Sequence, residues 1–452
     1  MKCVKNTFRG GVHPISHKEL TRDVPLRVLE TKGEMVFPLL QHIGKPAKPL
    51  VKKGDEVFVG QRIGEADGLI SAHVISSCSG KVKAVEKRRV QNGQMIECVI
   101  IDNDEQYTCL EGICEKQDIS SITREEIIQR IRDAGIVGLG GAGFPTHVKL
   151  SPKNPEAIRF VIANGSECEP YLTGIDQLMR SQADAIIEGF SLMLRLFPNA
   201  QGVVVIEDNK PEAIAAMQKA SAANDRISVL AAKTKYGQGG EKMLIETVAG
   251  INYPSSMLPA DVGCIVQSVG TIYAIDRAVV YREPLFTHTF TLTGDAVKTP
   301  GNYIVRDGVN FADLIEAAGG LKEGVEVKKA IVGGPIMGIA IPNLDVPVQK
   351  TSSGVALVTV DESEVANTLM TSCLRCGRCT TVCPVGLLPQ MLADAVQAGD
   401  LERYEKKLYG LECIQCGCCS YICPAKRPLT QTFMRTKAEI LAQKRAEAGG
   451  KK

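Results

Sequence analysis

The first strong pattern of apolar positions along the chain consists of short runs separated by glycines. It covers residues 46–118, and the turn glycines are Gly54, Gly60, Gly64, Gly68 and Gly80. Short apolar runs between glycine turns are typical of compact all-β units. We therefore expect a β-rich domain here, preceded by an extended lead-in over residues 1–45 that is rich in basic residues, proline and glycine.

The pattern changes to alternating strands and helices over residues 119–282. A capping box at Thr123 and Glu126 predicts a helix that ends near Gly135. Three strand-like runs follow and alternate with helical stretches, at 160–163, 203–206 and 227–231, with one clear helix at 211–222. This alternation predicts an α/β domain.

The last third of the chain divides into three further parts. Residues 283–362 combine β-type runs with the helical stretch FADLIEAAGG and predict a small β-plus-helix domain. Residues 363–436 contain most of the cysteines and predict a helical metal-binding domain. Residues 437–452 form a basic tail, which we expect to be a solvated helix end.

Length and charge limit the class of protein. A chain of 452 residues is too long for one core. With 44% apolar residues and a net charge of +2, it can bury several cores and carries no field that would select nucleic acid as its partner. We find no run of 18 apolar residues and no apolar leader segment, and so expect a soluble protein that is made and kept in the cytoplasm.

Two cysteine runs carry the strongest chemical signal. Each run has the spacing C-x2-C-x2-C-x3-C-P, and the second follows the first by forty residues. Four thiolates are the ligand set of a [4Fe-4S] cluster, and in this bacterial-type run the last cysteine ligates the other cluster. We predict one cluster on Cys373, Cys376 and Cys379 with Cys423, and a second on Cys413, Cys416 and Cys419 with Cys383.

The alternative for these cysteines is structural zinc. Zinc sites use pairs of C-x2-C rather than three cysteines in succession, so the spacing favours iron–sulfur clusters. Cys418 lies between ligands and has no place in either set. We expect it to pack in the core or to tune the cluster environment.

A glycine-rich loop marks a second candidate site. It comprises Gly138, Gly140, Gly141, Gly143 and Phe144. The loop follows a predicted helix and leads into Phe-Pro, unlike the dinucleotide fingerprint that joins a strand to a helix. Backbone without side chains can nevertheless approach a phosphate or a flat isoalloxazine ring. Tight turns without any ligand are the alternative interpretation.

Longer motifs connect this loop to a known family. The strings GLGGAGFPTHVKL, NGSECEPYLTGIDQLM, IEDNKPEAI and TKYGQGG are similar to the flavin- and NADH-binding subunit family of respiratory NADH dehydrogenase. Together with FRGGVHPISHKELT, GGPIMG and the doubled cysteine run, they make the chain resemble more closely the RnfC family, the C-type subunits of Rnf ion-translocating ferredoxin:NAD oxidoreductases. The resemblance covers nearly the whole chain.

The resemblance implies the fold class of each domain and a cofactor. It implies a barrel-sandwich hybrid over 46–118, an α/β FMN- and NADH-binding domain over 119–282, a soluble-ligand-binding β-grasp domain over 283–362 and a helical ferredoxin-type domain with two [4Fe-4S] clusters over 363–436. FMN would be held without a covalent bond, and NAD(H) would be the substrate. The implied lining residues are Gly138, Gly140, Gly141, Gly143, Phe144, Lys149, Asn164, Ser166, Cys168, Glu169, Tyr236, Gly239, Glu241, Val266, Gln267, Ser268 and Thr271. Three positions depart from the dehydrogenase family, at Ser166, Gly240 and Gln267.

The resemblance also implies a function and partners. The chain would be a peripheral subunit on the cytoplasmic face of the plasma membrane, attached through other subunits that include a ferredoxin-type iron–sulfur protein and that move the ions. It would exchange hydride between NAD(H) and FMN and pass single electrons to the clusters, because hydride carriers move two electrons and clusters move one. Two alternatives are a soluble NADH-dependent flavin and iron–sulfur reductase similar to corrin reductases, and a non-catalytic electron wire whose flavin site has decayed.

Overall fold

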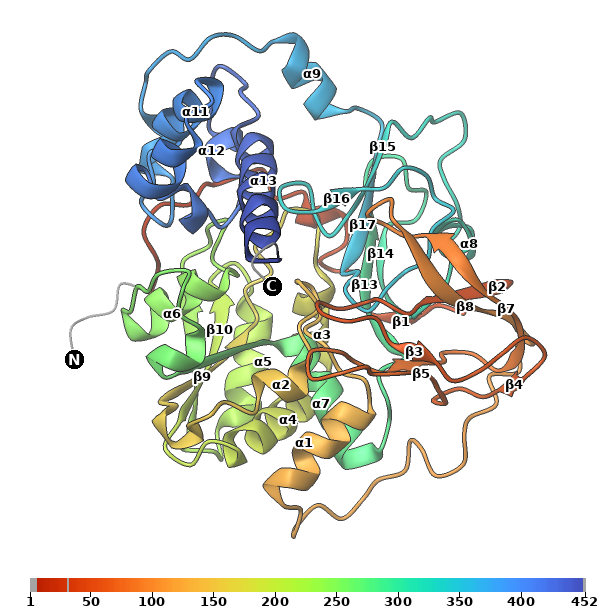
Figure 1. Ribbon diagram of the computed structural model, residues 1–452. Helices are drawn as coiled ribbons and strands as arrows, with labels where there is room; N and C mark the ends of the chain where they lie inside the picture. The colour runs from red at the N-terminus through yellow and green to blue at the C-terminus, as the bar shows by residue number, and fades with distance from the viewer. Residues whose placement is uncertain (1–5, 31, 450–452) are drawn as a thin grey trace.

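The computed structural model describes residues 6–30 and 32–449, so the first five residues of the lead-in and the last three of the basic tail lie outside it. Four sheets and their helices form the domains seen in Figure 1. Within the described residues, no helix has the length and apolar character that crossing a bilayer requires. The mixed fold class expected from the sequence is confirmed.

The barrel-sandwich hybrid consists of two small antiparallel sheets. One has the order β2-β8-β7-β4 and the other β3-β5-β6. The strands are β2 (Glu34–Pro38), β3 (Lys48–Pro49), β4 (Glu56–Val57), β5 (Arg62–Glu65), β6 (Val74–Ile75), β7 (Gly80–Arg89) and β8 (Met95–Asn103). Gly80 has φ 145°, and a Cβ on it would lie 2.0 Å from the Asp102 carbonyl oxygen, so only glycine fits where β7 begins.

The α/β domain is built on a parallel sheet of order β11-β10-β9-β12. Its strands are β9 (Phe160–Asn164), β10 (Gln201–Glu207), β11 (Ile227–Ala232) and β12 (Cys264–Ser268). Its helices are α1 (Arg124–Asp133), α2 (Thr146–Lys149), α3 (Gly174–Ser181), α4 (Ala183–Arg195), α5 (Pro211–Ser221), α6 (Glu241–Ala249) and α7 (Val269–Tyr281). The predicted capping box at Thr123 and Glu126 starts α1, and the three predicted strands are present.

The β-grasp domain contains a six-stranded mixed sheet of order β1-β14-β13-β17-β15-β16. Its elements are β1 (Arg27–Val28), β13 (Thr287–Thr293), β14 (Gly301–Arg306), α8 (Phe311–Ala317), β15 (Lys329–Val332), β16 (Ile339–Ala340) and β17 (Gly354–Val358). One hydrophobic core joins this sheet to the barrel-sandwich, since Phe37 and Val57 pack in the same cluster as Phe290 and Phe311. The two β domains therefore form one packed body.

The lead-in expected over residues 1–45 is not a separate segment. β1 pairs in parallel with β14 of the β-grasp sheet, and β2 pairs with β8 of the barrel-sandwich. Gly11 donates its backbone N–H to the Val382 carbonyl in the cysteine-rich domain. The opening segment thus crosses several domains.

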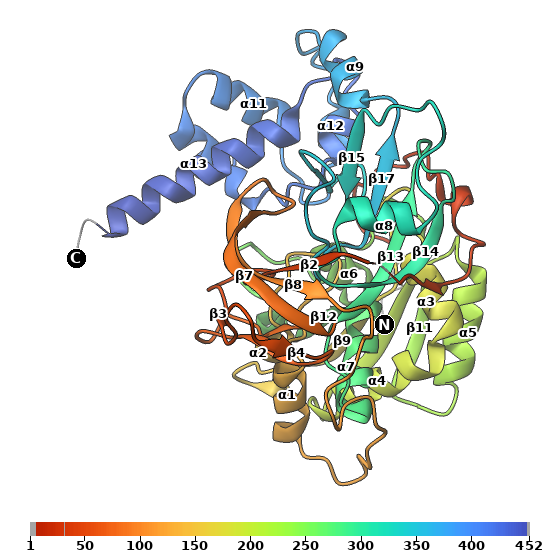
Figure 2. The ribbon, with the colours of Figure 1, turned by 90° about the vertical axis from the view of Figure 1, so that its right-hand side faces the viewer.

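The cysteine-rich domain is a compact group of helices. α9 (Glu362–Thr368) connects it to β17, and α10 (Arg378–Thr381), α11 (Pro389–Gln397), α12 (Cys418–Tyr421) and α13 (Leu429–Gly449) form its body. Tyr404 and Phe433 are among its buried core residues. α13 runs across the expected boundary at residue 436, and its second half projects away from the other helices (Figure 2).

Lys350 ties three domains together at one buried point. This lysine follows the β-grasp segment 346–349, and its Nζ donates to the His73 carbonyl of the barrel-sandwich at 2.8 Å and to the Gly135 carbonyl of the α/β domain at 2.7 Å. Its side chain is buried, and this burial lowers the pKa of Lys350 from 10.5 to about 8. Burying the charged Lys350 ammonium therefore costs free energy, and its hydrogen bonds to the two carbonyl groups offset part of this cost.

We predict that Lys350 makes stability depend on pH. A lysine whose pKa is about 8 when folded and 10.5 when free destabilises the fold below pH 8, and this cost, on the order of 3 kcal/mol, disappears as the pH rises toward 10.5. Thermal unfolding should show wild-type protein gaining stability relative to Lys350→Met between these pH values. The exposed Lys53→Met change is the control, and a difference independent of pH would contradict the prediction.

Candidate functional site

The glycine-rich loop is held at the carboxyl end of β12. The backbone N–H of Leu139 donates to Thr271 Oγ1 at 2.9 Å, and Thr271 Oγ1 lies 2.8 Å from Ser268 Oγ. Gln267 donates from Nε2 to Thr146 Oγ1, just after the loop. Three of the predicted lining residues, Gln267, Ser268 and Thr271, therefore position the loop.

The loop itself leaves room along its backbone. Gly140 and Gly143 have positive φ values of 76° and 67°. A Cβ on Gly141 would meet no atom within 4 Å, so this stretch of backbone faces open space. Such a backbone can present its N–H groups to a flat ring or to a phosphate.

The predicted residues after β9 meet those of the segment before α6. Asn164 donates from Nδ2 to the Gly239 carbonyl at 2.9 Å, and the N–H of Gly239 points to Cys168 Sγ at 3.4 Å. Burial raises the pKa of Cys168 to about 11, so its thiol is neutral near pH 7. β9 and β12 are adjacent parallel strands, so their carboxyl ends lie at one edge, where open α/β sheets bind ligands.

Lys149 reaches the same edge from α2. Its Nζ lies 2.6 Å from Glu241 Oε2 and 2.8 Å from the Val266 carbonyl oxygen. The three residues Lys149, Glu241 and Val266 were predicted from separate motifs, and the fold brings them into contact. A lysine held at this place offers a point charge to an anionic group.

Glu169 and Tyr236 form the part of the candidate site that faces the β-grasp domain. Glu169 accepts the backbone N–H groups of Ile336 and Met337, and Tyr236 donates its hydroxyl to Glu169 Oε1 at 3.3 Å. Burial raises the pKa of Glu169, while these hydrogen bonds act in the opposite direction. The GGPIMG loop of the β-grasp domain therefore lies directly on Glu169.

Sequence reasoning missed three charged residues that support this region. Lys18 donates its ammonium to the carbonyls of Glu167, Glu169 and Leu172. Lys210 donates to the Ser166 carbonyl at 2.7 Å and pairs with Glu207 at 3.1 Å in the buried interior. Lys210 and Glu207 stand in the motif IEDNKPEAI, whose pattern does not reveal their role.

A buried polar atom at this edge has no partner in the described part of the chain. The Ser166 side chain is fully buried, and its Oγ makes no hydrogen bond. Buried hydroxyls are nearly always paired, so an unpaired one beside Asn164 fits a site that receives a polar ligand. These residues fit the phosphate and ring edge of FMN.

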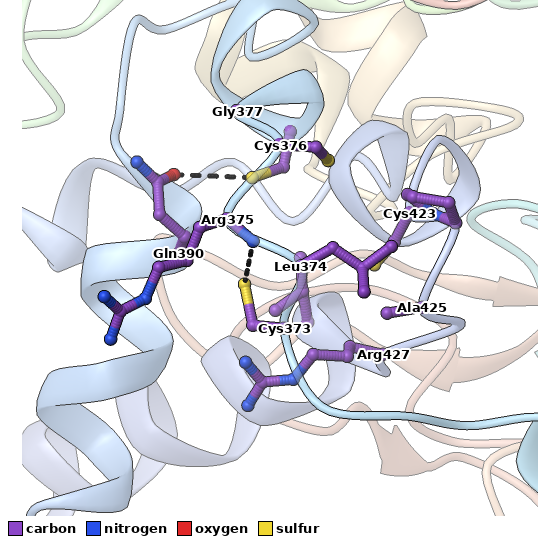
Figure 3. A pocket seen from close by; sticks show the side chains of 12 residues that line it. Cys373, Leu374, Arg375, Cys376, Gly377, Gln390, Cys423, Ala425 and Arg427 are labelled. Atoms are coloured by element: carbon purple, nitrogen blue, oxygen red, sulfur yellow. Dashed lines mark hydrogen bonds between the residues drawn. The ribbon is translucent and has the colours of Figure 1, made fainter.

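The first predicted cluster set surrounds a hollow in the cysteine-rich domain (Figure 3). Cys373, Cys376, Cys379 and Cys423 line it together, and the space between its walls is about 410 Å³, part of it open to solvent. The thiol of Cys379 points to Gln390 Oε1, and the backbone N–H of Arg375 points to Cys373 Sγ. Four soft donors around one space fit a [4Fe-4S] cluster.

The thiols of the second set also lie near one another. Burial is the main cause that raises the pKa of Cys419 to about 12, and the neighbouring Cys416, Cys413 and Cys383 act in the same direction. Among the described residues, no group of three or more His, Cys, Asp or Glu side chains is placed so that it could hold a single metal ion.

The second set is in direct contact with the edge of the α/β domain. Tyr236 donates its hydroxyl to the Cys416 carbonyl at 2.8 Å. Val12, Tyr236 and Cys418 form a small buried cluster, against which Cys168 and Ile336 pack. Cys418 therefore packs at the domain junction, and its hydrogen bond to Cys416 lowers the pKa of the Cys416 thiol.

Models of known protein families match each of the four domains. The family model of the RnfC barrel sandwich hybrid domain matches residues 6–106, and that of the Nuo51 FMN-binding domain matches 131–277. The SLBB domain model matches 289–340, and the 4Fe-4S dicluster domain model matches 368–424.

Curated relatives match over nearly the full chain, and each is the C component of its complex. That of the Na⁺-translocating ferredoxin:NAD⁺ oxidoreductase complex of Acetobacterium woodii is 41% identical, covering 98% of this chain and 99% of the relative. That of the proton-translocating complex of Clostridium ljungdahlii is 42% identical, covering 90% and 87%. That of the ion-translocating oxidoreductase complex of Vibrio cholerae is 38% identical, covering 88% of this chain and 51% of the relative.

We predict that Cys423→Ser damages the cluster of the other run. An alkoxide is a poor substitute for thiolate on iron, so the cluster of Cys373, Cys376 and Cys379 should lose its fourth ligand. Electron paramagnetic resonance of the anaerobic, reduced protein should show that the signal of this cluster is lost or converted to that of another cluster type. The signal of the Cys413-containing cluster should be retained. Cys109→Ser, at an exposed cysteine outside both sets, is the matched control. Loss of only the Cys413-containing cluster would contradict the pairing.

Proposed function

The chain belongs to the RnfC family of ion-translocating ferredoxin:NAD⁺ oxidoreductase complexes, and we propose that its NAD(H) chemistry takes place at the edge formed by the glycine-rich loop and the ends of β9 and β12. It is an electron-transfer subunit that uses FMN and two [4Fe-4S] clusters. A bound flavin supplies the exchange between hydride and single electrons.

Each part of the edge has a role in this proposal. The open backbone at Gly140 and Gly141 receives the flat ring, and Lys149 supplies the charge for the FMN phosphate or holds the ring edge. Asn164 and the unpaired Ser166 hydroxyl offer hydrogen bonds. Glu169 lies on the side of the nicotinamide nucleotide.

One contact carries the proposal. The Tyr236 hydroxyl bonds to Glu169 at the nucleotide edge and to the Cys416 carbonyl in a cluster-binding loop. A single side chain therefore spans the boundary between the two redox sites. Glu412 strengthens the boundary by accepting two hydrogen bonds from Ser255 of the α/β domain, at 2.7 and 2.8 Å.

The family name implies other subunits, and we place this one at the membrane through them. The subunits that move ions are separate chains, and a ferredoxin-type iron–sulfur protein is among the partners. We propose the cytoplasmic face, where NAD(H) is available. The corrin-reductase-like alternative loses support, because the RnfC barrel-sandwich model matches residues 6–106 and a curated RnfC relative shares the chain almost end to end.

We predict that Lys149→Ala weakens FMN binding. The change removes one charge-assisted contact, worth roughly 1.5 to 3 kcal/mol, which corresponds to a ten- to hundredfold loss of affinity. The anaerobic variant should keep its iron, lose flavin on dilution and regain NADH-dependent cluster bleaching when excess FMN is added. The exposed Lys153→Ala change is the matched control. Full flavin occupancy with unaltered NADH oxidation would refute the assignment of the glycine-rich loop and Lys149 as the FMN site.

We predict that Tyr236→Phe slows electron passage without removing FMN. Phenylalanine keeps the packing against Val12 and Cys418 but leaves the Cys416 carbonyl and Glu169 without this donor. In stopped-flow measurements, bleaching of the flavin by NADH should be unchanged, and bleaching of the clusters should be slower by a factor of a few. Equal slowing of both phases would show that Tyr236 acts on the flavin edge alone.

A further inference from the structure

The fold places the two cluster sets at different depths. The set of Cys413, Cys416 and Cys419 belongs to the loop that contacts Tyr236, Ser255 and, through Gly417, the Ile336 side chain. In Figure 1 the helices of this domain lie above α6 and β10. This set is therefore proximal to the flavin edge.

The other set is distal and reaches the surface. Cys376 is exposed, and Cys373 and Cys379 are partly exposed. Leu374, which follows Cys373, is 63% exposed, and Leu369 and Met370 are also exposed on the approach to this loop. We define the distal face as the surface formed by residues 369–378 and 424–427. Its two segments are joined by a hydrogen bond from the Thr371 N–H to the Ala425 carbonyl.

Charge is unevenly distributed around this face. The segments 369–393 and 413–438 contain no Asp or Glu, although the chain as a whole has 51 acidic and 53 basic residues. Their basic residues are Arg375, Arg378, Lys426, Arg427, Arg435 and Lys437. None of the six forms an ion pair within residues 6–30 and 32–449. Arg375, Arg378 and Lys426 are exposed on the distal face itself.

Two of these basic side chains point outward. Figure 3 shows Arg375 and Arg427 directed away from the hollow that the thiols enclose. Exposed apolar side chains beside unpaired positive charges are typical of a surface that meets a partner. Positive charge around a redox centre raises the rate of encounter with a negatively charged protein.

We propose that the distal face is the docking surface for an acidic one-electron carrier protein, and that electrons pass between this carrier and the flavin through the distal and then the proximal cluster. This rests on the function proposed above. In the direction of NAD⁺ reduction, two carrier molecules each give up one electron. These two electrons and one proton reduce NAD⁺ to NADH. The same face serves the reverse direction.

The experiment uses the full chain reconstituted anaerobically with FMN and its clusters. NADH formation from NAD⁺ is followed with two donors, a small acidic bacterial ferredoxin reduced beforehand and reduced methyl viologen, which is a cation. The test variant is Arg378→Gln with Lys426→Gln, since both residues are exposed and neither lines the hollow. The control variant removes the same charge from the barrel-sandwich, with Lys87→Gln and Arg89→Gln.

With ferredoxin, we expect the test variant to be slower by roughly three- to tenfold at low ionic strength, and the wild-type rate to fall as salt is added. With methyl viologen, the rate should be unchanged or slightly higher. The control variant should match the wild type with both donors. A wild-type ferredoxin rate that is independent of salt, or a test variant equal to the wild type, would overturn the proposal.

The viologen arm separates docking from other roles of these charges. If the test variant is equally slow with both donors, the two side chains act on the cluster itself and the docking proposal is wrong. If the wild type forms no NADH from viologen, the electron-transfer function has failed rather than the docking surface. Iron content, measured for each variant, shows that the clusters are retained.

Discussion

The hollow in the cysteine-rich domain depends on bringing together two segments that lie forty residues apart. Cys373, Cys376 and Cys379 come from one tight loop and Cys423 comes from the other, so this hollow does not form from one loop alone. Gly377 and Gly417 occupy equivalent left-handed positions at the starts of α10 and α12, with φ of 74° and 81°. This pairing makes the domain a compact body with one end open to solvent and the other pressed against the α/β domain.

The proximal end determines how the other domains meet. Tyr236, Glu169 and the GGPIMG loop come from the α/β and β-grasp domains, and they converge beside Cys416. A buried carboxylate held by two backbone N–H groups is costly to move, because either group would be left unpaired. Three domains are therefore mutually fixed at this point.

Local signals in the sequence predicted the elements better than the contacts between them. The capping box at Thr123 and the alternating runs predict α1 and β9 to β11, because caps and strand patterns are properties of neighbouring residues. Spacing alone predicts the fourth cysteine of each set, and Cys423 lines one hollow with Cys373, Cys376 and Cys379. Lys18 and Lys350 were not predictable, since each donates to backbone carbonyls more than 140 residues away and no local pattern marks such a partner.

The path of the first forty residues has a consequence for how the protein is made. This segment is synthesised before the residues that it contacts, since Arg27 pairs with Tyr303 of β14, Lys18 holds the loop at Glu167, and Gly11 contacts Val382. Its partners are synthesised much later, and domains otherwise fold in the order in which they emerge. The contacts of this segment therefore form only after the chain has been synthesised as far as Val382.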